Sequence, residues 1–161
     1  MCICLERMSK EEYLDFYKTS FESHVEELIR EEALSREVAE SESHNELQGM
    51  LPDGLDTADN FLYSIKLEGD TVGYIWFLTE MNEAVKQAFI CDFLIYEKYR
   101  GNGYGHAVLS KMEELAQDYL CQESVLFVEE ENIKARKLYE KSGYQIIKNH
   151  DYGFYMKKKL D

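Results

Sequence analysis

The five residues Tyr74–Leu78 constrain the fold of this chain more than any other part of its sequence. They read Tyr-Ile-Trp-Phe-Leu, an apolar run without polar alternation. A strand that is apolar on both faces must be covered on both faces, which is typical of a central strand. We therefore expect a layered protein in which helices pack on each side of a sheet.

The segments around this run supply the other strands. Residues 61–67, 71–78 and 84–96 are predicted as three successive strands, and Glu68-Gly69-Asp70 is typical of a tight hairpin turn between the first two. Alternation predicts a short strand near the start of the chain. Three further strands, each flanked by turn residues, are predicted towards its end. These four further strands are expected at residues 2–8, 124–128, 144–148 and 152–159.

Four segments are predicted as helices. Ser9 and Glu12 match a capping box at the start of the first helix, whose aromatic stripe is expected in the core. A second, more polar helix starts at Ser35, the third has an apolar stripe, and the fourth covers residues 133–141 and ends at Gly143. The order is β-αα-βββ-α-β-α-ββ, an α/β (α+β) chain with about seven strands and about four helices.

The length predicts a single domain over residues 1–161. The first residues lack the basic and apolar segments of a signal peptide, and no apolar run reaches the ~18 residues that a membrane span needs. The four cysteines have no metal-binding spacing, and Cys91 and Cys121 are expected as small core side chains. The sequence therefore predicts a cytoplasmic protein with no metal and no membrane partner.

The acidic residues are concentrated in one part of the chain. The net charge is −14, and residues 22–46 carry half of it, with nine glutamates and two arginines. This charge argues against a nucleic-acid partner, because phosphate contacts need basic side chains. One interpretation of the acidic segment is a solvated helical face, and the other is attraction of a cationic substrate.

The stretch Arg100–Gly105 reads Arg-Gly-Asn-Gly-Tyr-Gly and joins a predicted strand to a predicted helix. Its three glycines remove the Cβ atoms from one side of the turn, so another group can approach the backbone closely. The first amides of the following helix have no internal acceptor and lie at the positive end of the helix dipole. Such amides bind phosphate oxygens, and Arg100 adds a charged donor suited to a pyrophosphate.

Two other phosphate-binding loops do not fit this stretch. The dinucleotide-binding fingerprint needs its third glycine where His106 stands. A Walker loop needs a Gly-Lys-Ser/Thr ending, whereas this chain has Tyr104-Gly105-His106. A strand–helix connection that uses glycine only to turn is the remaining alternative to a coenzyme site.

Two motifs together resemble the GNAT superfamily of N-acetyltransferases, in particular its small, uncharacterised bacterial members. Arg100–Gly105 resembles the family signature Arg/Gln-x-x-Gly-x-Gly/Ala, and Asn132–Tyr144 is similar to its second motif, Asn-x-x-Ala-x-x-Leu-Tyr-Glu-x-x-Gly-Tyr/Phe, at every defined position. The resemblance implies a GNAT-like single domain with a mixed, mostly antiparallel sheet. Residues 59–161 would form the acetyl-CoA-binding core and residues 1–58 the variable, substrate-facing part. One departure is Glu97, where many members carry proline.

The resemblance implies that acetyl-CoA is the co-substrate. Backbone donors around Leu94 and Ile95 resemble the family's splayed strand, where the pantetheine arm pairs with the main chain and an amide faces the developing oxyanion. The alternative for both residues is ordinary sheet core. Asn132 either hydrogen-bonds the coenzyme or caps its own helix. The pyrophosphate would be held by the loop residues Arg100, Gly101, Asn102, Gly103, Tyr104 and Gly105.

Tyr139 resembles the family's tyrosine that protonates the departing coenzyme A thiolate, and its alternative is a packed aromatic residue. An alkyl ammonium with a pKa near ~10.4 also needs a proton acceptor before it can attack. Asp92, an acid within an apolar strand beside the predicted coenzyme path, is the candidate base, although it could equally face solvent or pair with a lysine. Glu83 and Glu129 are alternatives.

The predicted function is therefore transfer of acetyl from acetyl-CoA to a primary amine of a small molecule or peptide. The histidines form no constellation with a cysteine or serine, so we expect direct attack in a ternary complex. The alternatives are a coenzyme A-binding sensor without turnover and an acidic interaction protein. The acceptor is cationic under one interpretation of the acidic segment, and a homodimer stays open.

Overall fold

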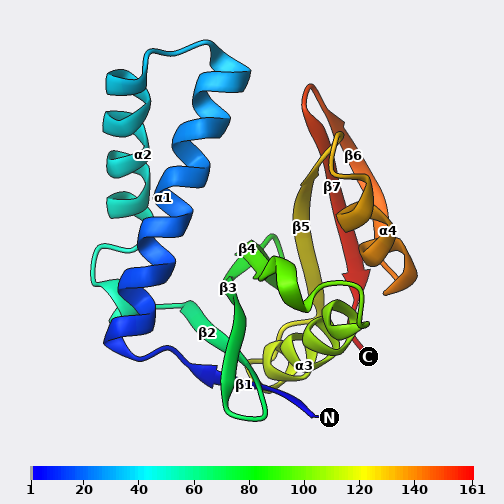
Figure 1. The fold of residues 1–161 in the computed structure, drawn as a ribbon. Coiled ribbons are helices and arrows are strands. Elements are labelled where there is room, and N and C mark those ends of the chain that lie inside the picture. Colours follow the sequence, from blue (N-terminus) through cyan, green and yellow to red (C-terminus); the bar gives the residue numbers. More distant parts are fainter. Residues whose placement is uncertain (1) are drawn as a thin grey trace.

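The computed structural model describes residues 2–161, so Met1 of the predicted domain lies outside the described residues. These residues form one seven-stranded sheet with helices on both faces (Figure 1). The α-helices are α1 (Lys10–Glu32), α2 (Arg36–Met50), α3 (Tyr104–Asp118) and α4 (Ile133–Lys141). The strands are β1 (Ile3–Arg7), β2 (Asn60–Leu67), β3 (Asp70–Asn82), β4 (Val85–Ile95), β5 (Glu123–Glu129), β6 (Gln145–His150) and β7 (Gly153–Lys159). The predicted class and order of elements are confirmed.

The strands follow the order β1-β2-β3-β4-β5-β7-β6 across the sheet. β4 and β5 run parallel, and the other neighbouring strands of the described chain pair antiparallel, as expected for a mixed, mostly antiparallel sheet. β3 is longer than the strand predicted at residues 71–78, because its pairing with β4 continues to Asn82.

β3 is the central strand that the apolar run predicts. Tyr74 and Trp76 pack against Phe16 of α1, with ring centroids 4.9 and 5.9 Å from the Phe16 ring. Ile75 and Phe77 are fully buried in the other core, which α3 covers. Because side chains alternate along a strand, both faces of β3 are covered by helices.

α1 begins with the predicted capping box. The Glu12 amide donates to Ser9 Oγ at 3.1 Å, and the Ser9 amide donates to Glu12 Oε1 at 3.0 Å. The helix ends at Ala33, whose φ of 53° lets the chain turn back into α2. The two helices lie side by side (Figure 1) and share a small core around Val25 and Ala39. In the part of the chain from residue 2 onward, no helix combines the length and the hydropathy of a membrane span.

β4 and β5 separate part-way along their length. Their parallel pairing stops at Ile90 of β4. A β-bulge lies at the same point, since Trp76 of β3 faces Asp92 whereas the next β3 residue faces Ile90. Cys91 is the extra residue of this bulge. Beyond it, the main chain of β4 has no paired strand on its β5 side within the described residues.

Candidate active site

A cavity of about 540 Å³ lies where β4 and β5 separate. Its lining comes from α1, α2, β3, β4, β5 and one face of α4 with its N-cap. Four residues predicted to act in catalysis or coenzyme binding lie in this lining, together with the alternative base Glu129: Asp92, Leu94, Asn132 and Tyr139. A cavity of this size with a few convergent polar groups is typical of a ligand site.

The bulge in β4 directs Asp92 to the α1 side of the sheet. The Tyr74 hydroxyl donates a hydrogen bond to Asp92 Oδ2 at 3.2 Å. Burial raises the pKa of Asp92 above its usual range, and the hydroxyl groups of Ser20 and Tyr74 offset only part of this rise. Cys91, expected as a core side chain, is half-buried; it packs against the core around Phe16 and also lines the cavity. An acid with a raised pKa beside a cavity is suited to accept a proton near neutral pH.

Tyr139 lies on the buried face of α4, with 8% of its surface exposed. Its ring packs against Tyr144 at a centroid distance of 5.9 Å. The hydroxyl has no hydrogen-bond partner among residues 2–161. Burial and the charge of Asp92 raise the pKa of Tyr139 to about 12, so the hydroxyl keeps its proton. Tyr139 therefore combines the two alternatives considered for it, because its ring packs in the core while its hydroxyl group is free to donate.

The glycine-rich stretch lies at the N-terminus of α3, outside the cavity lining. Gly101 and Gly103 have φ values of 80° and 78°, and nothing lies within 4 Å of a Cβ built on either. Gly103 is the N-cap of α3 and provides no side-chain acceptor for the first helical amides. The amides of residues 101–105 also have no main-chain acceptor in the described chain. Bare amides at a helix N-terminus are suited to phosphate oxygens.

The absence of a Cβ at Gly105 makes room for α4 rather than for a ligand. A Cβ at this position would lie 2.8 Å from Leu138 Cδ2 of α4. The glycine therefore lets α3 and α4 pack closely, so that the two sequence motifs are in contact. This differs from the expectation that all three glycines open the turn to a ligand, and only the Gly105 amide remains part of the predicted cradle.

The side chains of the loop hold its shape. Arg100 Nε donates to the Ile95 carbonyl oxygen at 2.8 Å. Asn102 Nδ2 donates to the carbonyl oxygens of Tyr99 and Arg100 at 3.1 and 3.3 Å. Tyr104 packs against the core below the loop. The loop is thereby attached to the end of β4, which also reaches the cavity.

The remaining predicted residues divide between the core, a helix cap and the surface. Ile95 packs in the core covered by α3 and does not line the cavity. Asn132 lines the cavity and also caps α4, because its Oδ1 accepts a hydrogen bond from the Ala135 amide at 3.2 Å. Glu83 is exposed in the turn between β3 and β4 with a φ of 57°, so the structure does not bring this alternative base to the cavity.

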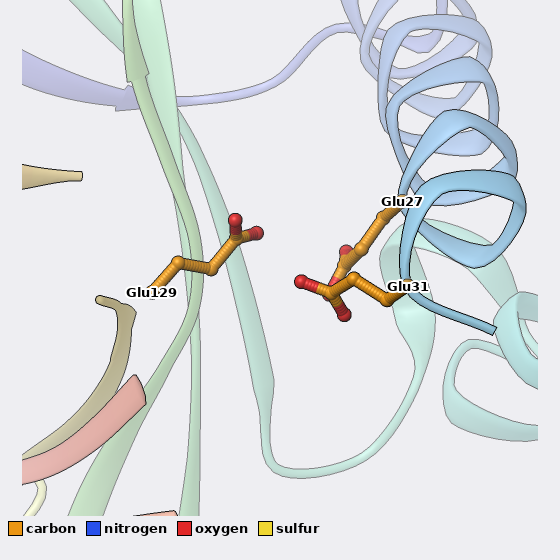
Figure 2. Close-up of side chains that lie close together, drawn as sticks. All are labelled: Glu27, Glu31 and Glu129. Atoms are coloured by element: carbon orange, nitrogen blue, oxygen red, sulfur yellow. The ribbon is translucent and has the colours of Figure 1, made fainter. Parts of the chain in front are cut away.

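Part of the cavity lining is acidic. Glu27 and Glu31 of α1 and Glu129 of β5 point toward one another (Figure 2), and their carboxylate oxygens lie within 4.8 Å of one another. We name these three residues the acidic triad. Burial and the charges of the other two carboxylates raise the pKa of Glu27 to about 7.

Sequence reasoning identified the acidic segment but not the members that face the cavity. A stripe of four polar α1 residues lines it, at the spacing i, i+3, i+4 and i+7 of one helix face: Ser20, Ser23, His24 and Glu27. That spacing is readable from the sequence once a helix is assumed. Glu129 comes from a distant strand, and no local pattern connects it with α1.

The match to known families decides the identity of the fold. The model of the Acetyltransferase (GNAT) family matches residues 14–144, which span both motifs and every residue that lines the cavity. The chain belongs to the GNAT acetyltransferase family. It is therefore an N-acetyltransferase by family, and the resemblance stated from the two motifs is confirmed.

Relatives of this GNAT chain support the assignment. Over 146 residues it is 35% identical to YycN, an uncharacterised N-acetyltransferase of Bacillus subtilis strain 168, which covers 90% of this chain and 94% of that protein. The crystal structure of YycN has a TM-score of 0.85 at 33% identity, covering 92% of this chain and 96% of that one.

Two further proteins share part of the sequence or the fold. The spermine/spermidine N(1)-acetyltransferase of Bacillus subtilis strain 168 is 35% identical over 83 residues, covering 48% of this chain and 55% of that protein. The PaiA N-acetyltransferase of Thermoplasma acidophilum, whose crystal structure contains coenzyme A, has the same fold with a TM-score of 0.72 at 18% identity, covering 99% of each chain.

Proposed function

We propose that this N-acetyltransferase moves the acetyl group of acetyl-CoA onto a primary amine by direct attack within a ternary complex. The observation that carries the proposal is the convergence of Asp92, Tyr139 and the edge of β4 at Leu94, which has no paired strand on its β5 side, on one cavity. Bound acetyl-CoA would supply an acyl group that is already activated as a thioester. Holding both reactants together can lower the barrier by ~7–11 kcal/mol.

The loop before α3 fits the diphosphate of coenzyme A. Its amides from Gly101 to Gly105 lack main-chain acceptors in the described chain, and Gly101 and Gly103 carry no Cβ that would cover them. Arg100 Nε is held by the Ile95 carbonyl, which orients the guanidinium so that its other N–H groups can reach a phosphate. We assign pyrophosphate binding to residues 100–105.

The free edge of β4 fits the amide-containing arm of the same coenzyme. Because pairing with β5 stops at Ile90, the main chain near Leu94 is available to bond an extended ligand as an added strand would. Leu94 also lines the cavity, so an arm bound here would lead from the loop to Asp92 and Tyr139. Asn132 would border this path while it caps α4.

Asp92 and Tyr139 are suited to opposite proton transfers. The raised pKa of Asp92 makes this carboxylate a stronger base, so we assign it the proton that the attacking ammonium must lose. With a pKa of about 12, Tyr139 stays protonated and can donate to the thiolate sulfur as the carbon–sulfur bond breaks. The two groups affect one another, since the Asp92 charge raises the pKa of Tyr139.

We further propose that the acceptor amine is cationic. Glu27 and Glu129 of the acidic triad line the cavity, and the triad would attract a positive charge to it. The partial relative from Bacillus subtilis, a spermine/spermidine acetyltransferase by name, agrees with a cationic acceptor.

Release of free thiol from acetyl-CoA, measured across a panel of amines, tests the proposal. We expect thiol release with amines, and calorimetric binding of coenzyme A in their absence. D92N should lower the rate by ~100-fold or more and remove its increase with pH. The matched control is D15N, which removes the same charge from an exposed position on α1.

Two results would contradict the proposal in different ways. Binding of coenzyme A without thiol release for any amine would favour a coenzyme A-binding protein without turnover. Absence of any heat with coenzyme A or acetyl-CoA would exclude the coenzyme site at Arg100–Gly105 altogether.

A further inference from the structure

We propose that the acidic triad binds a second, non-reacting ammonium group of the acceptor, so that the substrate is a linear diamine or polyamine. This inference rests on the proposed transfer of acetyl to an amine. Glu27 and Glu129 line the same cavity as Asp92 and Tyr139, and Glu31 completes the cluster within 4.8 Å. One cavity therefore contains the proposed reacting groups at one place and a cluster of negative charge at another.

The Tyr139 hydroxyl is independent evidence that this cavity holds a ligand. Tyr139 is more than nine-tenths buried, lines the cavity, and has no hydrogen-bond partner in the described part of the chain. Its hydroxyl oxygen is not one of the enclosed atoms without a partner, so it opens to the cavity, where a bound ligand would accept its hydrogen bond. The ligand that reaches Tyr139 occupies the same cavity that Glu27 and Glu129 border.

The protein itself does not neutralise the acidic triad. Arg30 is the basic side chain in contact with it, with its guanidinium 3.3 Å from Glu129 Oε2. One guanidinium balances one of three carboxylates. Glu46 of α2 also faces Glu27, although its carboxylate lies 2.9 Å from Nε2 of His24. A mobile cation of the substrate would supply the missing positive charge.

The ionisation of Glu27 reflects this excess of negative charge. Burial, with Glu129, Glu31 and Glu46, raises its pKa to about 7, and Arg30 opposes them only in part. An ammonium group beside Glu27 would lower that pKa again. Binding of the second charge should therefore become tighter as the pH rises through 7, where Glu27 loses its proton.

The spacing along α1 predicts the length of the substrate. The Ser20 hydroxyl lies beside Asp92 and lowers the pKa of that carboxyl group, against the larger rise that burial causes. Glu27 follows seven residues later on the same stripe of α1. At ~1.5 Å per residue these positions lie ~10 Å apart along the helix. An extended alkyl chain advances ~1.25 Å per bond along its axis, because its ~1.5 Å single bonds zigzag at tetrahedral angles. Two nitrogens separated by about eight bonds, or about seven methylenes, would span this distance.

A divalent metal is the competing occupant, because three carboxylates are also suited to Mg²⁺ or Ca²⁺. Two observations favour the ammonium. Arg30 already contacts Glu129, which disfavours a doubly charged ion at the same carboxylate. Glu27 and Glu129 also open to the cavity that holds the proposed reacting groups, where a linear amine could reach both places.

Steady-state kinetics with matched amines tests the subsite. The kcat/KM for α,ω-diamines of about four to ten methylenes is divided by that for n-alkyl monoamines of equal length. We expect the largest ratio near seven methylenes. E27Q should lower this ratio by ~10-fold, as expected for loss of a charge-assisted hydrogen bond. E26Q, which removes the same charge from an exposed neighbour outside the cavity, should leave the ratio as it is in wild type.

A direct binding measurement separates this inference from the proposed activity. Calorimetric titration of 1,7-diaminoheptane into coenzyme A-saturated protein should show ~10-fold weaker binding to E27Q, with or without turnover. Equal binding to wild type and E27Q would overturn the subsite even if acetyl transfer occurs. So would a rise in melting temperature with Mg²⁺ or Ca²⁺ that E27Q abolishes, because it would assign the triad to a metal.

Discussion

Replacing Glu27 by glutamine should stabilise the protein above neutral pH and leave its stability unchanged in acid. Burial and neighbouring carboxylates raise the pKa of Glu27 from 4.5 to about 7 in the folded protein. Because the folded chain holds this proton more tightly than the unfolded chain, the stability that the proton contributes is complete below about pH 4.5 and is lost as the pH rises through 7. Glutamine resembles the protonated side chain at every pH, so E27Q does not undergo this loss.

The size of the effect follows from the two pKa values. At ~1.4 kcal/mol per pKa unit, the difference between them corresponds to ~3 kcal/mol when Glu27 is fully ionised. The side chain is only half-buried, and solvent screens its repulsion from Glu129 and Glu31. We therefore expect a gain of ~1–2 kcal/mol in the free energy of unfolding of E27Q at about pH 8, and a gain of less than ~0.5 kcal/mol at about pH 5.

Urea unfolding of wild type and E27Q at several pH values between about 5 and 8 measures this difference. E26Q provides the control, because Glu26 is exposed on the same helix and its replacement should not change stability in a pH-dependent way. A constant difference between wild type and E27Q over this pH range would contradict the raised pKa of Glu27. It would mean that Glu27 ionises as an ordinary surface glutamate, and that the acidic triad does not concentrate charge.

Three further predictions concern catalysis and folding. Y139F should lower kcat by ~100-fold or more while the affinity for coenzyme A, measured by calorimetry, stays within about twofold of wild type; unchanged turnover would show that the hydroxyl donates no proton. G73A should reduce the free energy of unfolding by ~3 kcal/mol or more, because the new Cβ would lie 2.1 Å from the Leu94 carbonyl oxygen and push β3 from β4; a variant as stable as wild type in urea would contradict this packing. S9A should cost ~1 kcal/mol by removing the acceptor for the Glu12 amide, whereas S41A, on the exposed face of α2, should leave the thermal melt unchanged; equal melting temperatures for the two variants would contradict the cap.

Local patterns in the sequence were sufficient for most of the fold. The apolar run Tyr74–Leu78 predicts a strand covered on both faces, and β3 is buried between two cores because α1 covers one of its faces and α3 the other. The Ser9 capping box, like the positive φ of 98° at Gly143, depends on a few adjacent residues. Such features are readable in one dimension, since the groups that satisfy them lie within about four residues.

Contacts between residues far apart in the chain could not be predicted from the sequence. The turn between α1 and α2 has Ala33, rather than a glycine, at its residue of positive φ. The packing of α1 against α2 compensates for this unfavourable φ. The packing of Gly105 against Leu138 depends on the approach of two helices. Likewise, the acidic segment gave no sign that Glu27 and Glu31, rather than their neighbours, would meet Glu129.

The sequence alone determined the order of elements, the bare amides before α3 and the family to which the chain belongs. Tertiary structure decided where the reacting groups lie. The bulge at Cys91 depends on the register between β3 and β4, and it directs Asp92 to the cavity. The separation of β4 from β5 then brings Tyr139 and Glu129 to the same space. A side chain's neighbours across a sheet are set by strand pairing, and that pairing is a property of the folded chain as a whole.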